Sequence, residues 1–245
     1  MPNRKARWQA VLGDKSQEAR AIQILALALS HSYDWAVSNA ISTPRSHVIP
    51  PLLHAASKAV SLASLNAPDP PVEVLALSAR NVFELYLRLR HCLAADANCQ
   101  VWLAEAVADQ IQIYEGILGM DGPESDKTVL RQEIDRLRQG AVAKELQLSQ
   151  KLLLTKTLAR EVALEAEYSA FYKLYSKLVH PSSFVVNFPP ATVEAPMYRS
   201  MLILNVQIYG HLILDDLAAT VGLPADTIRS ETQALYEASA SGRAH

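Results

Sequence analysis

The chain has 245 residues, of which 50% are hydrophobic and 20% are charged, and its formal net charge is −2. This apolar content is enough for a folded core and excludes a chain that is disordered over most of its length. A chain so close to neutrality has no overall field that would draw it onto nucleic acid or an anionic membrane. Any such binding must therefore depend on a local patch.

The sequence favours a reducing compartment. Its two cysteines, Cys92 and Cys99, form neither a disulfide framework nor a Cys-x-x-Cys pair. The basic start of the chain is not followed by the apolar segment of a secretory signal. The longest apolar stretch, 21–30, is about half as long as a bilayer crossing requires. We therefore expect a cytoplasmic protein with no membrane partner.

Helical periodicity runs through almost the whole chain, and the one short strand-like piece is 184–188. Prolines and glycines divide the pattern into separate elements. A strongly charged segment at 123–158 is expected to form a solvated helical hairpin or arm. The other predicted helices cover, in chain order, 16–41, 49–65, 72–95, 98–118, 161–179, 197–221 and 226–238.

Helices that are joined by mostly short loops pack as antiparallel neighbours. The sequence therefore predicts an all-α antiparallel bundle of about seven to eight helices. We expect a single helical domain over 1–245, with its core at 16–222 and the charged arm at 123–158. The tail at 239–245 is expected to be disordered, as the ends of domains often are.

The predicted helix 72–95 carries charged residues among apolar ones. Arg80 and Glu84 are four residues apart and share a face, with Asn81 beside them and Arg88 one turn further on. One interpretation is an exposed ion pair worth a few tenths of a kcal/mol. The other is a polar network or functional site, because charge on a mostly apolar helix is costly unless it is paired.

A second polar stripe lies on the predicted helix 161–179, where Tyr172, Ser176 and His180 follow one another at intervals of four. His180 is either a general acid or base, or a residue that caps the end of the helix. Ser176 and Tyr172 can donate hydrogen bonds. If the two stripes face each other, they form either a site or a buried hydrogen-bond network that fixes the register of the helices.

The two motifs together resemble a known bacterial family. The pattern Arg-Asn-x-x-Glu at Arg80, Asn81 and Glu84, followed by Tyr-x-x-x-Ser-x-x-x-His-Pro-Ser at 172–182, resembles the family catalogued as domain of unknown function 5677. That family is similar to the HEPN superfamily. The resemblance covers the layout of the chain over roughly 22–209, and the two short motifs are its specific part.

The resemblance implies a HEPN-like helical core, and with it an activity. Many HEPN proteins are metal-independent ribonucleases of toxin–antitoxin and other defence systems, and they usually act as dimers. In them an arginine neutralises charge that develops on a phosphoryl group, and a histidine moves a proton to or from the 2′-hydroxyl. By this resemblance the candidate catalytic residues are Arg80, His180 and Ser176, with no metal and no other cofactor.

The spacing differs from the HEPN motif, in which the arginine precedes the histidine by four to six residues. The basic residues before His180 are Lys173 and Lys177, and lysine lacks the planar fork of arginine. The arginine would have to come from Arg80 on the other helix. The residues expected to bind a ligand or to form a polar network are Asn81, Glu84, Arg88, Tyr172, Lys173, Lys177 and Ser182.

Two classes of function stay open on this sequence. One is an RNA-directed enzyme that uses Arg80 and His180. The other is a non-enzymatic helical module that binds RNA, a second copy of the chain, an antitoxin or another protein, with the charged arm as a contact surface. The absence of an arginine close before His180 favours the module, whereas the paired polar stripes favour a site.

Other site chemistries have weaker support. His211 and Asp215 are four residues apart and share a helix face, with Asp216 adjacent, but the chain has no Glu-x-x-His or His-Glu-x-x-His metal motif. Gly116 and Gly119 follow no strand and precede no Gly-Lys-Ser/Thr, so a helix end and a turn are expected there rather than a nucleotide loop.

Overall fold

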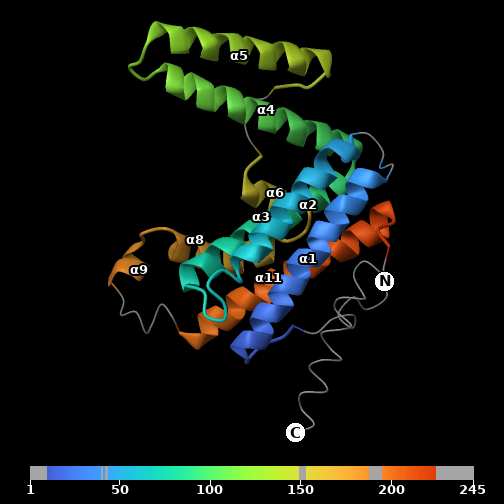
Figure 1. Cartoon of the computed structure of the whole chain (residues 1–245), viewed down its shortest axis with the longest axis vertical. Coiled ribbons are helices and arrows are strands. Elements are labelled where there is room, and N and C mark those ends of the chain that lie inside the picture. The colour runs from blue at the N-terminus through green and yellow to red at the C-terminus, as the bar shows by residue number, and fades with distance from the viewer. Residues whose placement is uncertain (1–9, 40, 42–43, 149–152, 188–194, 225–245) are drawn as a thin grey trace.

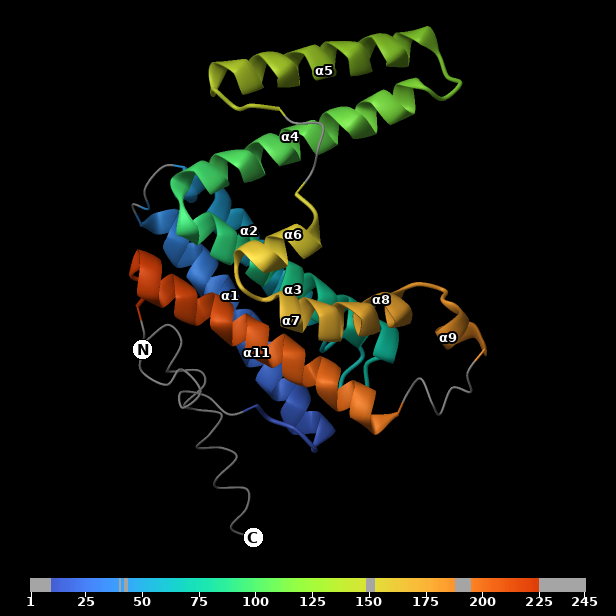
Figure 2. The same cartoon turned by 180° about the vertical axis from the view of Figure 1, so that it is seen from behind.

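The computed structural model describes residues 10–39, 41, 44–148, 153–187 and 195–224. Within these ranges the fold is all-α with no β-strand, which confirms the predicted fold class. The main bundle consists of four long helices that lie side by side (Figures 1 and 2). They are α1 (Lys15–Ser38), α2 (Arg45–Leu62), α3 (Val72–Ala94) and α11 (Pro196–Val221).

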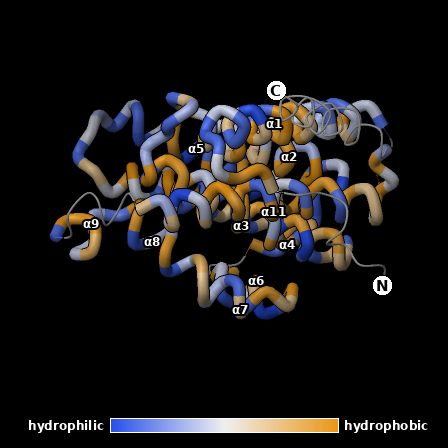
Figure 3. Tube along the Cα trace, turned by 90° about the horizontal axis from the view of Figure 1, so that it is seen from below, coloured by the Kyte–Doolittle hydropathy of each residue, from blue (hydrophilic) through white to orange (hydrophobic). Residues whose placement is uncertain are grey.

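The four helices contact one another in a ring, in the order α1, α2, α3 and α11, and α11 closes the ring against α1. Figure 3 shows that hydrophobic and hydrophilic residues are mixed throughout the described part of the chain. In α3, Leu75, Ala79, Val82 and Phe83 are completely buried at the i, i+3, i+4 spacing of a helix face. α3 is therefore the helix on which the other elements assemble.

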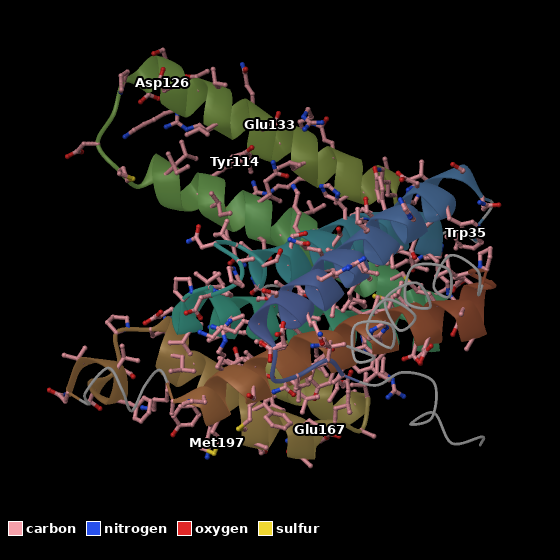
Figure 4. The ribbon with its side chains drawn as sticks, turned by 60° about the horizontal axis from the view of Figure 1, so that its bottom comes forward. Trp35, Tyr114, Asp126, Glu133, Glu167 and Met197 are labelled. Atoms are coloured by element: carbon pink, nitrogen blue, oxygen red, sulfur yellow. The ribbon has the colours of Figure 1, made fainter. Side chains whose placement is uncertain are left out.

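The charged arm differs from its prediction. It is a hairpin of α4 (Asp96–Leu118) and α5 (Glu124–Ala143) that projects from the bundle (Figure 1). Figure 4 labels Tyr114 on α4 and Glu133 on α5, where the two helices run side by side. The segment predicted as an arm extends too far, because its last part forms α6 (Thr155–Glu161), which packs on α3 of the bundle.

The predicted helix 161–179 begins later than expected, and it runs without a gap through α7 (Glu165–Glu167), the π-helix η2 (Tyr168–Tyr172) and α8 (Lys173–Val179). The break before α7 lies at Ala163, whose φ of 60° is left-handed and cannot continue a helix. The strand-like piece at 184–188 is helical instead, since α9 covers Ser183–Asn187. The predicted helix 226–238 and the tail 239–245 lie outside the described residues.

The lengths and compositions of the helices show whether any of them could cross a bilayer. Among the residues that the structure describes, none of the helices combines the length and the apolarity that a bilayer crossing needs.

Gly210 lies where α11 packs closely against α1. A Cβ atom at this position would lie 2.6 Å from Cδ2 and 3.2 Å from Cγ of Leu25, a buried side chain of α1. A larger residue here would therefore force the Leu25 side chain to shift, which favours glycine in spite of its low helix propensity.

We expect Gly210→Val to lower the free energy of unfolding by about 1–3 kcal/mol, because the branched side chain overpacks the contact with Leu25. The matched control is Gly116→Val in α4, where an added Cβ meets no atom within 4 Å. Urea unfolding of both variants checks the expectation. Equal stability of the two variants would show that α1 and α11 can separate at no cost.

Candidate functional site

The two polar stripes meet around the guanidinium of Arg80. Its Nε donates to Oε1 of Glu84 at 2.9 Å, and its Nη2 donates to the hydroxyl of Tyr172 at 2.8 Å. Its Nη1 lies 3.2 Å from Nε2 of His180. The guanidinium carbon also lies 5.1 Å from the centre of the Tyr172 ring. We call these four residues the Arg80 cluster.

The packing of α8 on α3 positions the cluster. Tyr175 and Leu178 are the buried side chains of α8, and the ring of Tyr175 lies 6.4 Å from that of Phe83 in α3. Along α3, Arg80 lies three residues before Phe83 and Glu84 is the residue after it. The buried apolar contact therefore sets the distance over which the Arg80 guanidinium reaches Tyr172 and His180.

The turn after α8 holds His180 at the edge of the cluster. His180 is the C-cap residue of α8, and its backbone N–H donates to the carbonyl of Ser176 at 3.3 Å. Ser182 closes the turn, because its hydroxyl donates to the carbonyl of Lys177 at 2.8 Å and its backbone N–H donates to the carbonyl of His180 at 2.6 Å. The imidazole of His180 stays exposed to solvent.

The contact between Arg80 and His180 can be a hydrogen bond in one direction only. A guanidinium has no acceptor, so Arg80 donates and Nε2 of His180 accepts. An imidazole nitrogen that accepts a hydrogen bond is also the atom that can take up a proton in general base catalysis.

The charges within the cluster stabilise one another. Burial lowers the pKa of the Arg80 guanidinium, but the hydrogen bond and the charge of Glu84 outweigh burial and raise that pKa overall. Burial and the carboxylate of Glu84 raise the pKa of the Tyr172 hydroxyl, against the opposing charge of Arg80. Arg80 is thus a permanent cation and Tyr172 a neutral hydroxyl near neutral pH.

Not every predicted site residue joins the cluster. Ser176 contributes its backbone carbonyl to the end of α8, and its half-buried hydroxyl makes no hydrogen bond with the described residues. Lys173 and Lys177 are exposed and form no ion pair within the part of the chain that the structure describes. Asn81 lies beside the cluster on α3 and faces a groove.

Arg88 belongs to a different network from Arg80. Its Nη1 and Nη2 bind the carboxylate of Glu105 in α4 at 3.0 and 3.2 Å, and its Nη2 also donates to the carbonyl of Leu153 at 3.0 Å. Glu105 accepts the backbone N–H of Leu153 at 3.1 Å. The guanidinium carbon lies 4.4 Å from the ring centre of Trp102. Arg88 therefore fastens α4 and the approach to α6 onto α3.

A groove of about 770 Å³ lies between the Arg80 cluster and the Arg88 network. On α3 the groove is lined by Glu84, which belongs to the Arg80 cluster, and by Arg88, which belongs to the network with Glu105. The rest of its wall comes from α2, α4 and the region of α6. The groove thus places an open space beside Glu84, whose carboxylate binds the guanidinium of Arg80.

Two features of the site have no counterpart in the sequence prediction. Tyr168 stacks on Tyr172 with ring centres 4.6 Å apart, across the single π-helical segment of the described chain. Such π-bulges are frequent at functional sites. Trp102 on α4 enters the groove. The four-residue spacing of Tyr168 and Tyr172 could have predicted that their rings stack. No local sequence pattern predicts that Trp102 lies near Glu84.

The alternative sites are occupied by other contacts. No group of three or more His, Cys, Asp or Glu residues is placed to hold a metal ion in the described parts of the chain. Asp216 lies 3.7 Å from Arg90, and burial lowers the pKa of His211 to about 4. Burial raises the pKa of the Cys92 thiol to about 12, which keeps it protonated and unreactive.

Comparison with known proteins adds no assignment. The sequence matches no family model, and neither the curated proteins nor the solved structures give a match. The resemblance to the HEPN-like family therefore stays a prediction that depends on the two motifs.

We expect Glu105→Ala to lower the free energy of unfolding by about 3–5 kcal/mol, because Arg88 would keep its buried charge without a carboxylate. The matched control is Glu133→Ala, which removes an exposed ion pair with Arg136 and should leave the stability nearly unchanged. Chemical denaturation measures both. Similar small losses in the two variants would contradict a fastening role for Arg88.

His211 makes the stability dependent on pH. Its pKa in the fold is about 4, below the ordinary value of 6.5, so the unfolded chain takes up the proton first. Stability from this group is therefore complete above pH 6.5 and falls as the pH decreases towards 4. At pH 5 the loss should be about 2 kcal/mol. Chemical denaturation at pH 7 and pH 5 should show that His211→Gln loses less unfolding free energy between the two pH values than the wild type does. An equal loss in the two proteins would show that His211 is not the group responsible.

Proposed function

We propose that the protein is a metal-independent endoribonuclease in which Arg80 and His180 act on one phosphodiester. The observation that carries the proposal is the distance of 3.2 Å between Arg80 Nη1 and His180 Nε2, two residues 100 positions apart in the sequence. HEPN-like ribonucleases are expected to use such a pair from one helix. Here the packing of α8 on α3 supplies the pair from two helices.

The guanidinium has the capacity to bind a phosphate without losing its anchors. It carries five N–H donors, of which the contacts with Glu84, Tyr172 and His180 use three. A phosphate oxygen that binds at Nη1 takes the place of His180. This exchange releases Nε2 of His180 beside the phosphate, while Glu84 and Tyr172 keep the guanidinium in position.

The reaction needs no metal, because the nucleophile belongs to the substrate. Nε2 of His180 takes the proton of the 2′-hydroxyl, and the 2′-oxygen forms a bond to phosphorus. The bond between phosphorus and the 5′-oxygen breaks, and the leaving oxygen takes a proton from water at this exposed site. Arg80 stabilises the negative charge that develops on the phosphoryl oxygens. The products are a 2′,3′-cyclic phosphate and a 5′-hydroxyl.

The wider setting belongs to the same proposal. A HEPN-like bacterial ribonuclease of this kind would act in the cytoplasm, as a homodimer or under the control of an antitoxin. Neither the HEPN relationship nor the dimer is needed for the chemistry, since Arg80 and His180 come from one chain.

A second candidate function, a protein-binding module without catalysis, is favoured by the arm. Ile113 and Ile117 on α4 and Met120 just after its end are 61%, 45% and 64% exposed, although they are large apolar residues on an arm that projects from the bundle. Exposed apolar residues grouped in this way are typical of surfaces that bind other proteins. Under this alternative the Arg80 cluster only links α3 to α8.

The deciding experiment is cleavage of labelled single-stranded RNA by the purified protein in excess chelator. We expect cleavage to products with 2′,3′-cyclic phosphate ends, and a loss of at least about a hundredfold in His180→Ala and in Arg80→Ala. His180 is exposed, so its replacement should not disturb folding. Circular dichroism and thermal unfolding check each variant.

Two matched controls separate the reacting pair from general effects. His54→Ala and Arg20→Ala change exposed residues outside the cluster, and both should cut like the wild type. If the wild type leaves RNA intact in chelator, or if His180→Ala cuts at the wild-type rate, the ribonuclease proposal is wrong. The exposed arm would then become the first place to look for a function.

A further inference from the structure

The groove beside the Arg80 cluster has the size and the wall of a ligand site. Its volume of about 770 Å³ lies within the range of roughly 300–1,000 Å³ that small-molecule sites occupy. Leu62, Leu85, Trp102 and Leu158 form much of its apolar lining. The polar groups on its wall are few, as is usual where a flat apolar ligand face is bound between side chains.

The charges on the groove leave a positive excess. Glu84 is balanced by Arg80, and Arg88 is balanced by Glu105. The third charged residue of the lining, Lys58 of α2, is exposed and forms no ion pair within the described residues. An occupant of this groove should therefore carry negative charge near Lys58 and an apolar or aromatic surface near Trp102.

The groove also offers one amide that can both donate and accept. Asn81 lines its wall next to Glu84, and its side chain makes no hydrogen bond with the described residues. An amide can pair with the edge of a nucleobase through its N–H and its carbonyl together. Glu84 joins this wall to the cluster, because its carboxylate binds Arg80 and its side chain also lines the groove.

We propose that the groove binds the nucleotide next to the phosphate that Arg80 holds, in single-stranded RNA. The base lies between Leu85 and the region of Trp102, Asn81 binds the edge of the base, and Lys58 binds the neighbouring phosphate. A single strand is required because a base within a duplex is stacked on both faces. This inference rests on the proposed ribonuclease function and adds to it a site for the base.

The test is a binding measurement that does not depend on cleavage. The probe is a fluorescein-labelled single-stranded 2′-O-methyl oligonucleotide, which has no free 2′-hydroxyl to attack the phosphate, and fluorescence anisotropy gives Kd at low salt. We expect Lys58→Glu to weaken binding by about tenfold and to lower the salt dependence, since one phosphate contact is lost. Lys127→Glu on α5 is the matched control and should bind like the wild type.

A second variant tests the apolar wall. Ala55→Phe places a ring into the groove from α2 and should weaken binding by about tenfold, because the ring takes the place of the stacked base. Asn81→Ala should change the relative affinity for oligonucleotides of different base composition. A duplex of the same sequence should bind more weakly than the single strand.

The outcomes separate this inference from the function on which it rests. If the groove variants bind like the wild type while RNA is cleaved, the groove inference is wrong and the ribonuclease proposal stands. If RNA is not cleaved but Lys58→Glu and Ala55→Phe both weaken binding, the groove stands as a nucleotide site without catalysis. A wild type that does not bind the probe overturns the groove inference directly.

Discussion

A guanidinium on the most buried helix of the bundle is the constraint on which the site depends. Arg80 follows the completely buried Ala79 on α3 and is itself 24% exposed, and a charge in such a place is costly unless it is paired. Glu84 supplies the pairing charge from the same helix, and Tyr172 and His180 complete it from the η2–α8 segment. The pairing of Arg80 therefore adds polar contacts to the apolar packing of α8 on α3, and the two together place the imidazole of His180.

The sequence predicted the bundle and much of the cluster because both depend on short-range periodicity. The four-residue spacing of Arg80 with Glu84 and the eight-residue spacing of Tyr172 with His180 placed each pair on a single face, and the structure brings the two faces together. Arg88 shows the limit of this reasoning. Its spacing placed it in line with Arg80, but the rotation of a helix over eight residues turns it towards α4, where Glu105 and Leu153 bind it.

The remaining differences arise from features with no periodic signal. The left-handed conformation of Ala163 and the π-helical turn at Tyr168–Tyr172 do not follow from the residue types at these positions. The extent of the arm was misjudged for a related reason. Charge alone marks a solvated helix, but it does not say where the chain rejoins the bundle.

The Arg88 network has a consequence for the arm as a whole. The chain leaves the bundle along α4 at Glu105 and is back beside the same residue at Leu153, so one guanidinium holds both ends of the excursion. The bundle therefore sets the position of these two ends and not the length of the hairpin between them. The hairpin tip is therefore free of the constraint that the Arg88 network places on the base of the arm, so a change in its length or sequence leaves that base unchanged.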